Sequence, residues 1–289
     1  MKICITGTEG FVGGHLQKFL IKKNFKLFFL DRKKIEDDSI IEETFKKINL
    51  IIHCAGSGQI KYPNNNKKLH YQNNVLLSQR LVRFIRKSKN KKIHLIYLSS
   101  QAVYGNPKII PIKESHETNP STDYGKTKLR VEKLFTNCKM LNKLTVLRLF
   151  SIYGNGLRKQ VVWDACEKLS KSRAIFYGSG YESRDFLNIN DLSNLIYKII
   201  LTEKFYKSAI FNVGSGVGTE IKKLIILISK FLKKEKLIKF KRNTKSTDSN
   251  FVSENNKIFK FFNWKSKIKI EKGLKEYTAW YKKINLNYL

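Results

Sequence analysis

The sequence predicts an α/β fold, a doubly wound and mostly parallel sheet with a smaller C-terminal substrate-binding lobe, and three observations lead to it. Short apolar runs typical of buried strands alternate with segments of helical periodicity. The first of these runs is followed at once by a glycine-rich turn. The chain has 289 residues, more than one hydrophobic core usually holds, so we expect two lobes.

The N-terminal segment MKICITGTEGFVGGHLQKFLIKKNFKLFFLDR has the pattern strand, turn, helix, strand. Its apolar start gives way to Leu16, Phe19 and Leu20 at helical spacing, and the run 26–30 forms the next strand. The remaining expected elements are buried strands at 50–53, 93–98, 144–149 and 210–213, and helices at 74–87 and 124–137. Strands that alternate with helices predict a parallel sheet whose ligands bind at the carboxyl ends of the strands.

The alternation loosens after Asn155. We therefore expect residues 1–154, joined by 186–213, to form the sheet domain. The segments 155–185 and 214–289 then form the smaller lobe.

The net charge of +34 suggests nucleic acid or an anionic membrane as a partner, but its distribution argues against both. Lysines are spread along the whole chain, as in a compositional bias that places lysine on solvated faces. The four cysteines have neither disulfide nor zinc spacing, and no metal site is expected. We find no signal peptide and no apolar stretch long enough to span a membrane, so we expect a cytoplasmic protein.

The turn after the first strand carries Gly7, Gly10 and Gly13, and Asp31 ends the next strand. This is the pattern of a Rossmann-type dinucleotide site, in which the glycines admit a pyrophosphate and the acid binds the adenosine ribose. Arg32 leaves the cofactor open, because an arginine there can seat a 2′-phosphate. We expect NAD, with NADP possible, because the carboxylate of Asp31 repels such a phosphate.

Four segments together, TGTEGFVGGHL, IIHCAG, SSQAVYG and YGKTK, resemble the extended short-chain dehydrogenase/reductase family, the NAD-dependent nucleotide-sugar epimerases and dehydratases. Later segments agree, among them LRLFSIYG, GSGYESRDFLNINDL and FNVGSG. The resemblance covers nearly the whole chain. It implies a nucleotide-diphosphate sugar as substrate and NAD as cofactor.

The resemblance assigns catalysis to Ser100, Tyr124 and Lys128. A free tyrosine has a pKa near ~10, and bringing it to ~7 takes about 4 kcal/mol of preferential stabilisation of the phenolate. Lys128, one helical turn from Tyr124, and the cationic nicotinamide ring are expected to supply it together. Tyr124 would then take the proton of a sugar hydroxyl, which Ser100 orients, while Lys128 also holds the nicotinamide ribose.

Further residues of the expected cofactor site follow from the same segments. Phe11 and Val12 lie in the glycine turn, and Ala55 and Gly56 belong to IIHCAG. Asn74 fits the asparagine that the family has near its active site, although an asparagine capping a helix that begins there is an alternative.

The expected substrate-binding residues lie mainly in the second half of the chain. Arg184 fits the arginine that grips the substrate pyrophosphate, and a surface arginine paired with Asp185 is the alternative. Ser100 would contact the sugar, and the remaining candidates are Ser151, Arg158, Lys245 and Asp248. Ser151 and Lys245 replace an asparagine and an arginine of the family, and Arg158 fits a solvated turn equally well.

Gln101 and Ala102 stand where the 4,6-dehydratases of the family carry Asp-Glu, which disfavours elimination of water. SSQAVYG resembles the epimerase version of this segment, so the expected function is a C4 epimerase of the UDP-hexose type. The alternative is an NAD(P)H-dependent 4-ketoreductase of a dTDP-, GDP- or UDP-4-keto-6-deoxy sugar. A non-catalytic dinucleotide sensor or RNA-binding relative is disfavoured, because Ser100, Tyr124 and Lys128 are all retained. The resemblance also implies a homodimer and a role in polysaccharide precursor synthesis.

Overall fold

The computed structural model describes residues 1–30, 45–58, 67–171, 174–202, 207–235, 238–241 and 250–285. The chain forms two compact units. The first comprises Met1–Asn106, Glu114–Leu149 and Leu195–Asn212, and the second Pro107–Lys113, Phe150–Asn194 and Val213–Leu289. The sequence had suggested that 107–113, 150–154, 186–194 and 213 belong with the first unit, whereas they lie in the second.

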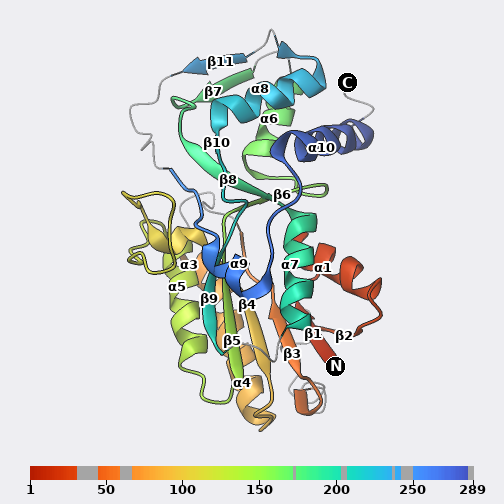
Figure 1. Ribbon diagram of the computed structural model, residues 1–289, viewed down its shortest axis with the longest axis vertical. Helices are drawn as coiled ribbons and strands as arrows, with labels where there is room; N and C mark the ends of the chain where they lie inside the picture. Colours follow the sequence, from red (N-terminus) through yellow and green to blue (C-terminus); the bar gives the residue numbers. More distant parts are fainter. Residues whose placement is uncertain are drawn as a thin grey trace. The chain divides into compact units, whose positions relative to one another are not determined.

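The first unit holds a six-stranded sheet with the strand order β2-β1-β3-β4-β5-β9 (Figure 1). The pairs β1-β2, β1-β3, β3-β4 and β4-β5 are parallel. The order reverses at β1, which lies between β2 and β3, and this reversal is the feature that places ligand sites in doubly wound sheets. The predicted fold class is confirmed.

The strands of this sheet are β1 (Lys2–Thr6), β2 (Lys26–Leu30), β3 (Leu50–His53), β4 (His94–Ser100), β5 (Lys143–Leu149) and β9 (Ala209–Val213). The helical elements beside them are α1 (Phe11–Ile21), α3 (Lys67–His70), η3 (Tyr71–Leu76), α4 (Leu77–Lys87), η4 (Gln101–Tyr104), α5 (Asp123–Thr136) and α7 (Ile189–Leu201). Of these, α7 begins in the second unit and ends in the first. Figure 1 shows α1 and α5 on opposite sides of the strands.

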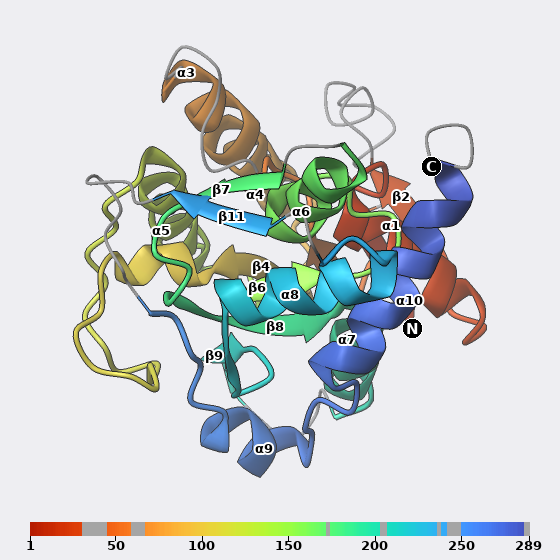
Figure 2. The same ribbon diagram turned by 90° about the horizontal axis from the view of Figure 1, so that it is seen from above.

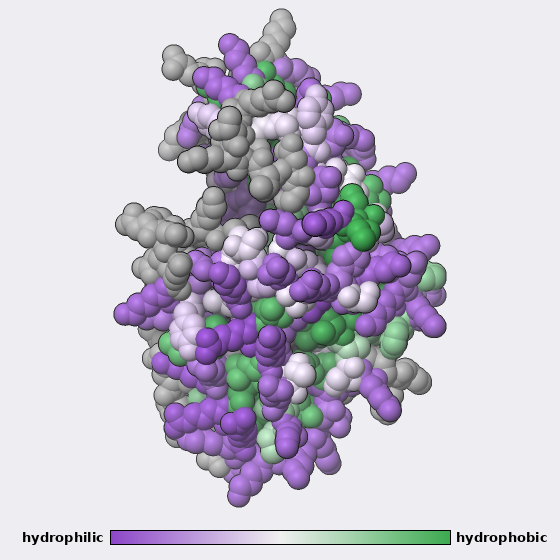
Figure 3. Space-filling view, turned by 90° about the vertical axis from the view of Figure 1, so that its left-hand side faces the viewer, coloured by the Kyte–Doolittle hydropathy of each residue, from purple (hydrophilic) through white to green (hydrophobic). Residues whose placement is uncertain are grey.

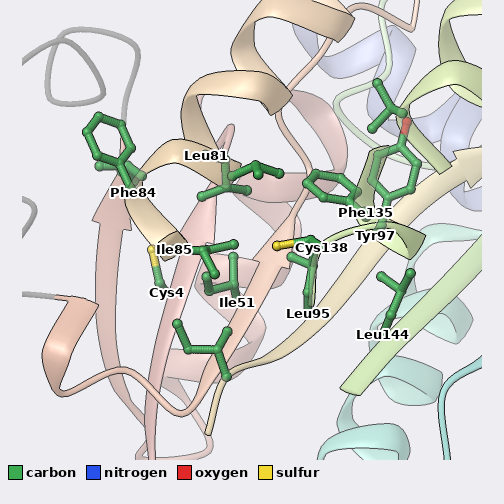
Figure 4. Packing of buried hydrophobic residues seen from close by; sticks show 14 of the residues in the cluster. Cys4, Ile51, Leu81, Phe84, Ile85, Leu95, Tyr97, Phe135, Cys138 and Leu144 are labelled. Carbon is green, nitrogen blue, oxygen red and sulfur yellow. The ribbon is translucent and has the colours of Figure 1, made fainter. Parts of the chain in front are cut away.

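Alternation along the strands decides which helices cover which face. Side chains one apart in a strand point to opposite faces, so Leu95 and Tyr97 of β4 share one face while Ile96 faces the other. Leu95 and Tyr97 belong to a buried cluster with residues of α4 and α5, including Leu81 and Phe135 (Figure 4). These two helices therefore bury the same face of the sheet.

The helical segment after β3 begins at Lys67, earlier than the sequence predicted. It runs through the π-helical turn η3 into α4. Asn74 lies inside η3 and is buried, so the alternative that it caps a helix is wrong. π-helical turns are rare in proteins and are frequently located at functional sites.

The second unit contains two small sheets, of order β10-β8-β6 and β11-β7, and several helices (Figure 2). Its strands are β6 (Ser151–Tyr153), β7 (Ala174–Tyr177), β8 (Ser183–Asn188), β10 (Gly218–Glu220) and β11 (Ile238–Lys241). Its other helices are α6 (Gln160–Ser170), α8 (Ile221–Leu232), α9 (Asn256–Phe262) and α10 (Ile270–Ile284). Figure 2 shows α10 beside α8 and β11 beside β7.

Candidate active site

The glycine turn has the geometry of a pyrophosphate cradle. Gly7 has φ +72°, a conformation that side chains with a Cβ rarely adopt, and its carbonyl accepts a hydrogen bond of 3.1 Å from the Gly10 N–H. A Cβ on Gly13 would lie 2.1 Å from the Gly7 carbonyl oxygen, so helix and turn touch backbone to backbone. Gly10 precedes α1 without a capping side chain. The first N–H groups of α1 are therefore left to bind an anion.

This turn meets the loop after β3 at the point where the strand order reverses. A Cβ on Gly7 would lie 2.6 Å from the backbone of Ala55, and one on Gly56, whose φ is +137°, would lie 2.7 Å from the Asn74 side-chain oxygen. Only glycine permits these approaches. The residues present fit a dinucleotide, with Gly7, Gly10 and Gly13 close together and Ala55 and Gly56 beside them.

The other predicted cofactor residues divide into two groups. Phe11 and Val12 are half-buried in the first turn of α1, next to the cradle. Asp31 and Arg32, on which the choice between NAD and NADP depends, lie outside the described residues.

Ser100, Tyr124 and Lys128 all lie in the first unit, each with less than a tenth of its surface exposed. Ser100 is the last residue of β4, and its hydroxyl oxygen accepts a 3.2 Å hydrogen bond from the Ala102 N–H. Tyr124 and Lys128 lie one turn apart on α5, which begins at the cap Thr122. Ser100 also hydrogen-bonds the Tyr124 phenol. The structure thus brings the three predicted catalytic residues together.

Close backbone packing explains the glycine that follows Tyr124. A Cβ on Gly125 would lie 2.4 Å from the Ala102 carbonyl oxygen in η4. The start of α5 can therefore approach the end of β4 closely enough for Ser100 to reach Tyr124.

Burial dominates the electrostatics of this group. It raises the pKa of Tyr124 to about 12, against a smaller lowering by the Ser100 hydrogen bond. It also lowers the pKa of Lys128 to about 8, while Cys54 and Glu132 act in the opposite direction. The Lys128 ammonium donates a 2.9 Å hydrogen bond to the Leu98 carbonyl and lies 5.8 Å from the centre of the Tyr124 ring. The protein's own groups thus keep the phenol protonated.

Sequence reasoning missed Thr127. Its hydroxyl donates to the Tyr124 carbonyl at 2.8 Å, and its oxygen lies 3.0 Å from the Asn74 side-chain nitrogen. The Asn74 oxygen in turn accepts a 2.9 Å bond from the Ser57 N–H. Asn74 therefore joins the loop after β3 to α5. No signal in one sequence announces this bond, since Thr127 has the appearance of an ordinary helix residue.

A second missed feature is a buried ion pair between α5 and β5. The Glu132 carboxylate accepts two hydrogen bonds from the Arg148 guanidinium, at 3.1 and 2.8 Å, and a third, of 2.5 Å, from the Ser99 hydroxyl. Arg148 also donates to the Tyr104 hydroxyl at 3.0 Å. Glu132 follows Lys128 by one more helical turn, so the spacing Tyr124, Lys128, Glu132 was a usable signal.

Apart from Ser100, which lies in the first unit, the predicted substrate-binding residues of the described ranges belong to the second unit. Ser151 is half-buried at the start of β6, and Arg158 is exposed. Arg184 in β8 is half-buried and stacks on Phe251, with its guanidinium carbon 5.1 Å from the ring centre. Burial lowers the pKa of Arg184, and nearby Glu182 opposes this. Lys245 and Asp248 lie outside the described residues.

Asp185, the neighbour of Arg184, is wholly buried, and its carboxylate accepts hydrogen bonds from backbone N–H groups. Its carboxylate accepts hydrogen bonds from the N–H groups of Ser215, Gly216 and Ser253, at 2.6, 3.0 and 3.1 Å. This carboxylate therefore ties two loops of the second unit to β8.

Hydrophilic residues are distributed over the face that Figure 3 shows, with hydrophobic ones between them. Among the helices of the described ranges, none is long and apolar enough to cross a membrane. The same ranges contain no group of three His, Cys, Asp or Glu residues arranged to hold a metal ion. All four cysteines are free thiols.

The sheet, the glycine turn at its reversal point and the buried Ser-Tyr-Lys group define a dinucleotide-binding α/β protein of the short-chain dehydrogenase/reductase type. Comparison with known proteins agrees. The chain belongs to the NAD-dependent epimerase/dehydratase family, whose pattern matches residues 3–214.

Two curated relatives and one solved structure illustrate the similarity. The UDP-glucose 4-epimerase of Halalkalibacterium halodurans is 27% identical in an alignment 266 positions long, which covers 78% of this chain and 78% of the relative. The GDP-6-deoxy-D-talose 4-dehydrogenase of Aggregatibacter actinomycetemcomitans is 26% identical over 79% of each chain. The UDP-glucose 4-epimerase of Thermotoga maritima, solved with UDP-glucose, superposes with a TM-score of 0.86 at 22% identity, covering 99% of this chain and 100% of the other.

Proposed function

We propose that the protein is an NAD-dependent nucleotide-sugar epimerase that inverts C4 of a UDP-hexose. The observation that carries this is the burial of Ser100, Tyr124 and Lys128 together at the end of β4 and the start of α5. The family supports the cofactor, and the similarity to UDP-glucose 4-epimerases supports the reaction.

The cofactor would be held at the glycine turn, with its pyrophosphate against Gly10 and the first N–H groups of α1. NAD⁺, when bound there, supplies a reversible acceptor for the C4 hydride of the sugar, so that C4 passes through a ketone. The Tyr124 oxygen takes the O4 proton and later returns it, and Ser100 hydrogen-bonds the same O4. Lys128 keeps a positive charge beside the phenol and would hold the nicotinamide ribose of a bound cofactor.

Retention of the ketone intermediate is the task of the second unit. We infer that Arg184 binds the substrate diphosphate, with Ser151, Arg158, Lys245 and Asp248 as further contacts. A planar guanidinium matches phosphate oxygens in a bidentate way. A diphosphate anchored in this way lets the sugar turn over and present its other face.

The test is to incubate the protein with UDP-glucose or UDP-galactose without added cofactor and to follow the sugar by NMR. Interconversion is expected in the wild type, and Tyr124→Phe should lower the rate at least ~100-fold, as loss of a general acid–base group does. Tyr197→Phe is the matched control. Tyr197 lies on α7 and packs against Phe19 and Phe25, so the variant removes a phenolic hydroxyl that is not part of the proposed site. Equal rates in the wild type and Tyr124→Phe would refute the assignment.

A second candidate is an NAD(P)H-dependent 4-ketoreductase, favoured by the similarity to a GDP-6-deoxy-D-talose 4-dehydrogenase. A reductase consumes reduced cofactor, so absorbance at 340 nm would fall in proportion to product when a 4-keto-6-deoxy sugar nucleotide and NADPH are added. The epimerase regenerates its cofactor in each turnover and produces no such change.

We further propose a homodimer in the cytoplasm. The family resemblance supports the dimer, and the four free thiols fit a reducing compartment. Light scattering of the purified protein measures the oligomeric state directly.

A further inference from the structure

A chain of buried hydrogen bonds leads from the strand before the glycine turn to the catalytic tyrosine. It starts at Thr6, whose hydroxyl lies 2.8 Å from His53 Nδ1, and continues from His53 Nε2 to the Ser78 hydroxyl at 3.0 Å. Ser78 bonds the Asn74 carbonyl at 2.7 Å, and the Asn74 side chain reaches Thr127. All of these residues are less than a tenth exposed.

The direction of each bond follows from counting protons. The hydroxyl of Ser78 gives its one proton to the Asn74 carbonyl, so its oxygen accepts from His53 Nε2–H. The neutral ring then has Nδ1 as its acceptor, and Thr6 donates to it. The Thr6 oxygen is left to accept from the Ala55 N–H, at 3.1 Å.

The same reasoning settles the far end. The Thr127 hydroxyl gives its proton to the Tyr124 carbonyl, so its oxygen accepts from the Asn74 amide. The Asn74 oxygen meanwhile accepts from Ser57. Burial lowers the pKa of His53 to about 3, helped by Lys128, so the ring remains neutral as this pattern requires.

The two ends of this series of hydrogen bonds lie beside the glycine turn and beside Tyr124, whose relative positions matter for the proposed reaction. Thr6 immediately precedes Gly7, and Ala55 is the residue against which Gly7 packs. Thr127 bonds the peptide carbonyl of Tyr124 itself. Between them these hydrogen bonds tie β1, β3, α4, η3 and α5 to one another through buried side chains.

We propose that His53 and Thr127 are positioning residues, which hold the glycine turn and the Tyr124 end of α5 in fixed register through this buried chain. The catalytic half of this inference rests on the proposed function. A displaced phenol costs turnover because proton transfer needs hydrogen-bond contact with the sugar hydroxyl.

The test compares Thr127→Val with two controls. Thr127→Ser keeps the hydroxyl. Thr136→Val removes a hydroxyl of the same helix, which donates a 2.9 Å hydrogen bond to the Glu132 carbonyl. Thr136 is not part of the series of hydrogen bonds that joins Thr6 to Thr127. In Thr127→Val the Asn74 amide loses its anchor, and Asn74 no longer holds the Ser57 N–H.

Two readouts are expected to move together. Hydrogen exchange of the Ser57 amide should become at least ~10-fold faster in Thr127→Val, because its acceptor is free to rotate. The kcat for interconversion should fall ~10- to 100-fold with KM for the nucleotide sugar unchanged within about twofold. Thr127→Ser and Thr136→Val should match the wild type in both.

A merely structural hydroxyl would give a different result. Thr127→Val would then lower the melting temperature as much as Thr136→Val does, without the other two effects. An unchanged hydrogen exchange of the Ser57 amide overturns the inference, and so does an unchanged kcat. Should the wild type convert no nucleotide sugar, the proposed function fails on its own. The exchange comparison then decides the coupling, since equal exchange in the two valine variants would contradict it.

Discussion

The buried ion pair of Glu132 and Arg148 gives the sharpest stability prediction. Both side chains are only 5% exposed, and their closest contact is 2.8 Å. Glu132→Gln keeps the shape but leaves the guanidinium as an uncompensated buried charge. Breaking such a pair from one side costs about 3–5 kcal/mol. At roughly 2–4 °C per kcal/mol for a protein of this size, the melting temperature should fall by about 6–20 °C.

A more exposed pair supplies the control. Glu167 of α6 and Lys171, the residue that follows this helix, lie 3.9 Å apart, and their side chains are 33% and 78% exposed. Glutamine at position 167 can still accept the hydrogen bond of the Tyr281 hydroxyl. Glu167→Gln should change the free energy of unfolding by at most about 0.5 kcal/mol, because water screens such pairs. Urea unfolding and calorimetry of the two variants, side by side, measure the difference.

The double variant Glu132→Gln/Arg148→Met separates charge from packing. Removal of the stranded guanidinium should restore at least ~1 kcal/mol relative to Glu132→Gln alone. The reasoning is refuted if Glu132→Gln is within about 1 kcal/mol of the wild type, or if the double variant is less stable than the single one.

Three more outcomes are expected. Gly13→Ala should lose both stability and NAD binding, because its Cβ would lie 2.1 Å from the Gly7 carbonyl oxygen. In Gly10→Ala the Cβ would lie 3.3 Å from the same oxygen, so this variant should keep the fold and only bind NAD more weakly. Calorimetry measures both the unfolding and the NAD binding. Burial lowers the pKa of His94 to about 3, so the free energy of unfolding should fall as the pH drops below ~6.5. At pH 5 the protonation of this histidine in the unfolded chain accounts for a loss of ~2 kcal/mol. Urea unfolding of His94→Asn should therefore show a smaller decrease in stability between neutral pH and pH 5 than the wild type does. Glu132 raises the pKa of Lys128, so Glu132→Gln should move the alkaline limb of the kcat profile to lower pH, and an unmoved limb would exclude this coupling.

The fold could be predicted from the sequence because its buried strands are short apolar runs that can be recognised one by one. The expected strands at 26–30 and 50–53 coincide with β2 and β3. The helix after β3 was placed too late, because its π-turn and its polar start KKLHYQNN show no apolar periodicity. Tertiary contacts rather than local propensity form that turn.

The candidate site was predictable where a residue type is forced by geometry or chemistry. Gly7 and Gly13 follow from backbone approach, and Tyr124 with Lys128 from their spacing on one helix. The environment of the phenol was not predictable. How far burial raises the pKa of Tyr124 depends on side chains that only the folded chain brings around it.

The division of the chain has a consequence for how the protein is made. The backbone passes from one unit to the other after residues 106, 113, 149, 194 and 212. The edge strand β9 ends at Val213, so a ribosome must release most of the polypeptide before the six-stranded sheet has all its members. Until then β5 offers an unpaired edge to any neighbouring nascent chain. The net charge of +34 makes copies of the chain repel one another, which disfavours association through that edge.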